Sequence, residues 1–200
     1  MKLVGVYLSP YVRRVAAAMI SRGLPYEHEP VNGYREFDVA SRYNPVAKVP
    51  SLVLDDGEIL IESSAILDYL NELVPSAPLI PAGSQARRAT LKLAAIGQGI
   101  CEQSVRLSAV RRGSQTAPES DTKRWRAQVL GGLSALDAVA GEGGPLRAAP
   151  LDAAGITAIV AVELVALINP DLEIPSNPRL AEFVAQHRET PPFAQTRPTL

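Results

Sequence analysis

The sequence predicts an α/β unit over residues 1–74, a linker at 75–84 and an all-α helical bundle over residues 85–200. Three observations support this division. Strand and helix patterns alternate through the first 73 residues. Prolines then recur and prevent regular structure, at Pro75, Pro78 and Pro81. Beyond them, apolar residues fall at helical spacing and no strand pattern persists.

The α/β unit should begin with a strand over Leu3–Tyr7 and a helix over Pro10–Arg22, which ends at Gly23. Asp55-Asp56-Gly57 indicates a hairpin turn. The other elements expected are strands at 26–31, 51–54 and 58–61 and helices at 36–43 and 63–73. The order βαβαββα suits a small mixed sheet with helices on its faces.

The second unit should contain helices around residues 93–110, 125–140, 156–168 and 178–188. Ile156–Ile168 is apolar nearly all round, so it should lie at the centre of the bundle. It is too short for a membrane span, which needs about 20 residues. Cys101 lies among core-like residues and is expected to be packed rather than reactive.

The composition and motifs of the chain exclude several classes of function. The net charge of −1 argues against a nucleic-acid or membrane-surface partner. The single cysteine excludes a disulfide framework and a cysteine-based zinc site, and no metal-ligand cluster or phosphate-binding loop is present. The opening apolar run is too short for a signal peptide, so a cytoplasmic protein is expected. His28 and His187 form no catalytic pair and are expected on solvated faces.

Ser9-Pro10-Tyr11 lies between the first strand and the first helix. With cysteines in place of Ser9 and Val12, this stretch would read as the Cys-Pro-Tyr-Cys element of a glutaredoxin. The chain should therefore bind another molecule's thiol rather than cycle its own. Ser9 suits a helix N-cap, and its hydroxyl could also lower the pKa of a thiol bound there. Tyr7 and Tyr11 are nearby phenols, for which packing is favoured over catalysis.

Glu62-Ser63-Ser64 begins the third helix. Ser63 could be an N-cap and Glu62 a carboxylate favoured by the helix dipole. The same pair also fits an α-amino acid head. The N–H groups at the helix start and the Ser63 hydroxyl would bind its carboxylate, while Glu62 would accept from its ammonium. Upstream, Lys48-Val49-Pro50 places a proline directly before a strand, where a trans bond is common.

The whole chain resembles the cytosolic glutathione transferases, and is closest to small bacterial members with a Ser-Pro-Phe/Tyr motif. The residues that carry the resemblance are Ser9-Pro10-Tyr11, Asn44-Pro45, Lys48-Val49-Pro50, Glu62-Ser63-Ser64-Ala65-Ile66 and the helical second half. The resemblance implies a thioredoxin-like N-terminal domain, a helical C-terminal domain and a homodimer. It also implies a cis Val49–Pro50 bond that turns the Val49 backbone toward a bound peptide.

The resemblance further implies the site. Glutathione, a co-substrate with no other cofactor, would be bound by Val49, Pro50, Glu62 and Ser63 and activated by Ser9. Arg35 or Lys48 would contact its glycine carboxylate. Tyr11 and, less directly, Tyr7 would border the pocket for a small electrophile. The expected function is a glutathione transferase. The alternative is a non-catalytic glutathione-binding or protein-interaction member of the same fold.

One stretch departs from the family pattern. The start of the sixth helix usually carries a reciprocal capping box, but here Asp152 is followed by Gly155 at the position of the returning carboxylate. Asp152 can still cap the helix. We therefore expect a weakened helix start.

Overall fold

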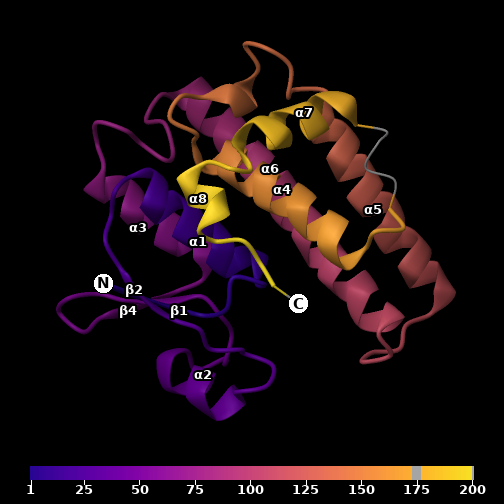
Figure 1. Ribbon diagram of the computed structural model, residues 1–200, viewed down its shortest axis with the longest axis horizontal. Coiled ribbons are helices and arrows are strands. Elements are labelled where there is room, and N and C mark those ends of the chain that lie inside the picture. Colours follow the sequence, from indigo (N-terminus) through magenta and orange to yellow (C-terminus); the bar gives the residue numbers. More distant parts are fainter. Residues whose placement is uncertain (173–176, 200) are drawn as a thin grey trace. The chain divides into compact units, whose positions relative to one another are not determined.

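A computed structural model describes residues 1–172 and 177–199 (Figure 1). The chain forms two compact units. The N-terminal unit comprises Met1–Ala82 together with the segment that begins at Glu189, and the helical unit comprises Gly83–Arg188. This division differs from the predicted linear one, because the segment after Arg188 packs with the α/β unit rather than with the helical bundle.

A four-stranded mixed sheet forms the centre of the N-terminal unit. Its order is β2-β1-β3-β4, with β1 parallel to β2 and antiparallel to β3, and β3 antiparallel to β4. The strands are β1 (Lys2–Val4), β2 (Glu27–Glu29), β3 (Ser51–Val53) and β4 (Ile59–Ile61). All four are shorter than predicted. Tyr7 lies in a turn, because the chain leaves the strand at Gly5, whose φ is +133°.

Helices cover both faces of this sheet. In Figure 1, α1 (Pro10–Ser21) and α3 (Ser63–Leu73) lie on one side and α2 (Phe37–Tyr43) lies on the other. Val4 packs into a core cluster with Ala40 of α2. Leu3 is also fully buried and points to the opposite face, because successive strand residues alternate. Both faces therefore carry core.

The segment after Arg188 contributes a short helix, α8 (Pro191–Ala194), that packs against α1. Phe193 is 1% exposed, and its carbonyl accepts a hydrogen bond of 3.4 Å from Nη2 of the buried Arg13. Helix α8 was not predicted from the sequence, because four residues that begin with two prolines carry no helical periodicity.

The helical unit consists of α4 (Ser84–Arg111), α5 (Glu119–Asp137), α6 (Ala153–Ile168), α7 (Pro178–His187) and a short 3₁₀ turn, η1 (Pro145–Arg147). Helix α4 packs along both α5 and α6. Nearly all of α6 is buried, as predicted. Cys101 is buried, also as predicted. Across residues 1–172 and 177–199, no helix is long and apolar enough to cross a membrane.

Asp152 caps the start of α6. Asp152 Oδ1 accepts from the backbone N–H groups of Ala154 and Gly155 at 2.9 and 3.0 Å, and Oδ2 accepts from the Thr90 hydroxyl at 2.6 Å. A β-carbon on Gly155 would lie only 2.7 Å from the Leu146 carbonyl oxygen. Position 155 thus has no room for a returning carboxylate side chain, and Thr90 instead holds the capping carboxylate of Asp152 in place. Asp152 thus caps α6 as predicted, and the weakened helix start stays a prediction.

Candidate functional site

Ser9 occupies the N-cap position of α1, with Pro10 as the first helical residue. Its carbonyl accepts from the Arg13 N–H at 3.0 Å, but its side chain makes no capping hydrogen bond to the helix. The predicted side-chain cap is therefore absent. The half-buried hydroxyl is instead available to a group bound at the start of α1.

Val49 lies beside the turn that leads to Ser9. A β-carbon on Gly5 would lie 2.5 Å from Val12 Cγ2 and 2.9 Å from Val49 Cβ, so these three residues pack closely. The Val49–Pro50 peptide bond is cis, as the resemblance implied. The first turn of α1 and the loop before β3 thus meet at Gly5.

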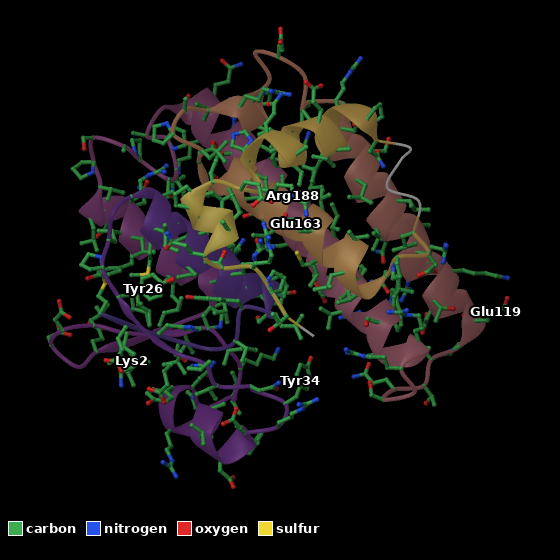
Figure 2. The ribbon with its side chains drawn as sticks, viewed as in Figure 1. Lys2, Tyr26, Tyr34, Glu119, Glu163 and Arg188 are labelled. Atoms are coloured by element: carbon green, nitrogen blue, oxygen red, sulfur yellow. The ribbon has the colours of Figure 1, made fainter. Side chains whose placement is uncertain are left out.

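The basic candidates Lys48 and Arg35 belong to neighbouring loops. Asn44, 3% exposed, donates from Nδ2 to the Lys48 carbonyl at 2.8 Å and so holds the loop before Pro50. Arg35 lies in a turn closed by the Asn32 side chain, next to the 88% exposed Tyr34, which Figure 2 labels. A β-carbon on Gly33, in the same turn, would lie 3.4 Å from the Ala47 carbonyl oxygen. Both cationic side chains are exposed near this junction.

Glu62, rather than Ser63, is the N-cap residue of α3. Its Oε2 accepts from the N–H groups of Ser64 and Ala65 at 2.9 and 3.3 Å, and its Oε1 accepts from the Ser63 hydroxyl at 3.2 Å. The φ angle of Glu62 is +69°, a conformation that costs about 1–3 kcal/mol in a non-glycine residue. Sequence pattern could not predict this backbone geometry. The exposed carboxylate and the buried Ser63 hydroxyl are thereby brought together.

A buried guanidinium connects α1 to the start of α3. Arg14 is 2% exposed, and its Nη2 donates to the Ser64 hydroxyl at 2.7 Å. Helix α1 is therefore hydrogen-bonded to the first turn of α3. A buried role for Arg14 was not predicted from the sequence, because a basic residue in a helix is usually solvated.

Tyr7 is engaged away from the start of α1. Its ring stacks on His28 with centroids 4.0 Å apart, and its hydroxyl lies 2.9 Å from that of Tyr26. Burial raises the pKa of the Tyr26 phenol, and the hydrogen bond with Tyr7 raises it further. These contacts favour the packing interpretation of Tyr7. Tyr11 is half-buried in the first turn of α1.

Both histidines are partly buried, and so are less solvated than expected. His28 is half-buried and its Nε2 lies 2.8 Å from the Gly5 carbonyl oxygen. His187 Nδ1 lies 2.8 Å from the Phe183 carbonyl oxygen. Tyr26 directly precedes β2 and His28 lies within it, and both contact Tyr7, which alternation along a strand does not indicate.

Comparison with known proteins identifies the family. Residues 3–78 match the model of the glutathione S-transferase N-terminal domain. The GST-like protein YibF of Escherichia coli is 30% identical over 141 residues, which cover 68% of each chain. The chain belongs to the glutathione S-transferase family. A maleylacetoacetate isomerase of Pseudomonas aeruginosa is 38% identical to this family member over 94 residues, 44% of each protein.

Solved glutathione S-transferase structures match the full length of the chain. One from Methylobacterium radiotolerans, in complex with glutathione sulfonate, is 26% identical with a TM-score of 0.90, over 100% of this chain and 95% of the other. Another from Pseudomonas fluorescens, with bound glutathione, is 28% identical with a TM-score of 0.84, over 100% and 99%. These neighbours confirm the predicted fold class, a thioredoxin-like α/β domain followed by an all-helical domain.

Proposed function

We propose that the protein binds glutathione and lowers the pKa of its thiol, so that the thiolate attacks a small electrophile. The observation that carries this proposal is the Ser9 hydroxyl. It lies at the N-terminus of α1, next to the loop of the cis Val49–Pro50 bond, and is not used to cap the helix. Two solved neighbours bind glutathione or its sulfonate, which supports the choice of thiol.

In this proposal the backbone of Val49, ahead of the cis Pro50, pairs with the peptide of glutathione. The γ-glutamyl ammonium binds the Glu62 carboxylate, which is exposed and already oriented by its own helix. The γ-glutamyl carboxylate binds the start of α3 and the Ser63 hydroxyl. Arg35 or Lys48 provides a positive charge for the glycine carboxylate.

The chemistry is thiolate stabilisation and positioning. The Ser9 O–H donates to the glutathione sulfur, which favours loss of the thiol proton to water. The sulfur then forms a bond to the electrophilic carbon, while that carbon loses a leaving group as an anion or the electron pair of its double bond shifts away and takes up a proton from water. No covalent bond to the protein is needed. Tyr11, in the first turn of α1, borders the electrophile, whereas the hydroxyl of Tyr7 is already bonded to Tyr26. Glutathione is a co-substrate, and no other cofactor is required.

Titration of the ultraviolet thiolate absorbance of bound glutathione tests the role of Ser9. Ser9→Ala should raise the pKa of the bound thiol and lower turnover at neutral pH about tenfold or more. Because no cap is lost, the melting temperature should change little. With oxidised glutathione, the Ser9→Cys thiolate should attack the disulfide, form a mixed disulfide and release one reduced glutathione, and so gain thiol-transfer activity. Superimposable titrations of wild type and Ser9→Ala would reject Ser9 as the activating group.

The alternative, a non-catalytic glutathione-binding protein, predicts a different result for the wild type. Glutathione would bind, as calorimetry would show, but its thiol would titrate as it does in water. The Ser9 hydroxyl, which makes no capping hydrogen bond, favours the catalytic hypothesis.

We also propose a homodimer related by a two-fold axis, as the family resemblance implies. Light scattering at micromolar concentration should give twice the chain mass of 21.3 kDa. A monomer would contradict this proposal without affecting that of glutathione binding.

A further inference from the structure

The turn that carries Ser9 is bonded to strand β2 through Gly5. The Gly5 N–H donates to the Glu29 carbonyl at 2.8 Å, and the Gly5 carbonyl oxygen lies 2.8 Å from His28 Nε2. A carbonyl oxygen can only accept a hydrogen bond, so Nε2 is the protonated nitrogen of the His28 ring in this contact. The strand thus holds the Gly5 peptide by its backbone and by a side chain.

The imidazole of His28 makes a second contact with the same turn. It stacks on Tyr7 with an interplanar angle of 4°, and the Tyr7 hydroxyl is bonded to that of Tyr26, labelled in Figure 2. His28 lies in strand β2 and Tyr26 directly precedes it, whereas Gly5 and Tyr7 belong to the turn before α1. One ring therefore fixes two positions that flank Val6.

Val6 accepts a backbone hydrogen bond from Ser9. The Ser9 N–H donates to the Val6 carbonyl at 3.0 Å. A shift of the Gly5–Val6 peptide would consequently move Ser9. It would also disturb the packing of Gly5 on Val49. A displacement of about 1 Å at a reacting group can cost about 100-fold in rate.

We propose that His28 is a positioning residue for Ser9, which it holds in place by donating from Nε2 to the Gly5 carbonyl. The proposal rests on the proposed function, because Ser9 must act on a bound thiol for its position to matter. His28 itself touches neither glutathione nor the electrophile in this scheme. A purely apolar ring at position 28 would keep the stack on Tyr7 but would release the carbonyl.

Two variants separate the hydrogen bond from the stack. His28→Phe retains an aromatic ring and loses the donor, whereas His28→Gln loses the ring and carries an amide nitrogen at a similar reach. The matched control is His187→Phe, since His187 also contacts a backbone carbonyl and an aromatic ring, both of Phe183 in the helical unit. Each variant is assayed for kcat, for KM of glutathione and for the titration of the bound thiol.

His28→Phe should lower kcat about tenfold and raise the pKa of the bound thiol, with KM for glutathione changed less than about twofold. His28→Gln should recover most of this loss, and His187→Phe should resemble the wild type. Equal losses in His28→Phe and His187→Phe would reduce His28 to a packing residue and overturn the proposal. An equal loss in His28→Gln and His28→Phe would overturn the role of the donor.

Nitrogen NMR of the wild-type imidazoles provides a readout that does not depend on the folding of a variant. His28 should appear as the Nε2–H tautomer with a hydrogen-bonded proton. A predominant Nδ1–H tautomer would overturn the proposal. A wild type that binds no glutathione would overturn the proposed function and this inference together. A wild type that activates glutathione alongside an unaffected His28→Phe would overturn the inference alone.

Discussion

Glu62 caps its own helix and is also the residue proposed to bind the γ-glutamyl ammonium. Its carboxylate caps α3 from a strained backbone conformation, and it remains exposed. Strain of this kind persists where the surrounding structure over-determines a position, and such positions cluster at binding sites. The cap and the binding role can be separated, because the cap needs only an oxygen acceptor whereas an ammonium group favours a negative charge.

Glu62→Gln should retain the cap through its amide oxygen and lose the charge. We expect glutathione affinity to fall by about 1.5–3 kcal/mol, measured by calorimetry, with little change in melting temperature. Glu72→Gln is the matched control, since Glu72 is an exposed glutamate at the other end of the same helix. Unchanged affinity in Glu62→Gln would place the γ-glutamyl ammonium elsewhere.

Glu29 should make stability depend on pH in the acidic range. The hydrogen bond from Tyr43, followed by that from Lys2, holds the pKa of this carboxyl below its usual value. A lowered pKa contributes stability above the unfolded-state value of about 4.3, and this contribution is lost as the pH falls through the folded-state value.

Glu29→Gln should therefore lower the free energy of unfolding at neutral pH by about 0.5–1 kcal/mol, a modest effect because the group is partly exposed. The difference from wild type should shrink in urea titrations as the pH is lowered to about 3. Glu27→Gln is the control, since Glu27 is more exposed and 3.7 Å from Lys2. A difference that is constant with pH would contradict the assignment.

At the scale of single residues, motif spacing predicted that Ser9 and Glu62 lie at helix starts and that Val49 lies before a strand. It did not predict what each side chain contacts. Ser9 is at the predicted helix start without capping it, and Glu62 caps in place of Ser63. His28 was missed because its partner is a backbone carbonyl, which no residue pattern records. The place of each residue relative to the helices and strands was predictable from the sequence. The hydrogen-bond partners were not, because they depend on backbone angles.

Among the elements, two adjacent glycines of α5 should respond in opposite ways to the same change. A β-carbon on Gly131 meets nothing within 4 Å, whereas one on Gly132 would lie 2.6 Å from Ile100 Cγ1 of α4. Gly131→Ala should stabilise the protein by about 0.5–1 kcal/mol through helix propensity. Gly132→Ala should destabilise it by about 1–3 kcal/mol through overpacking.

Urea unfolding of the two variants measures both effects, and each variant serves as the control of the other. Stabilisation by both changes would show that α5 and α4 are not in close contact at Gly132. Destabilisation by both would mean that Gly131 has a packing role in the folded protein.

The accuracy of the predicted bounds differed between elements, and α4 begins nine residues before its predicted start at residue 93. Helix α3 has the predicted bounds, because apolar residues repeat over three turns. The strands were predicted too long, since alternation continues past the last paired residue: Tyr7 fits the pattern but follows the bend at Gly5. Similarly, the close approach of Gly155 to the Leu146 carbonyl depends on tertiary packing and left no local signal.

At the scale of the whole molecule, Phe193 should matter for the stability of the N-terminal unit although it lies far in sequence from residues 1–82 of that unit. Phe193→Ala removes a ring that is 1% exposed and should cost about 3–5 kcal/mol. Phe37→Ala is a matched control in the same unit, because Phe37 is 63% exposed and should cost less than about 0.5 kcal/mol. Chemical denaturation compares them, and equal costs would contradict the packing of α8 against α1.

The contact between α1 and α8 also has a consequence for biosynthesis. A ribosome makes the chain from its N-terminus, so residues 1–82 emerge long before the segment that begins at Glu189. The helical unit can fold as a continuous stretch as soon as Arg188 has emerged, whereas the N-terminal unit must wait for Phe193 to close its core. The unit whose synthesis begins first therefore lacks Phe193 until after the helical unit has been made, and the face of α1 that packs against α8 stays uncovered until then.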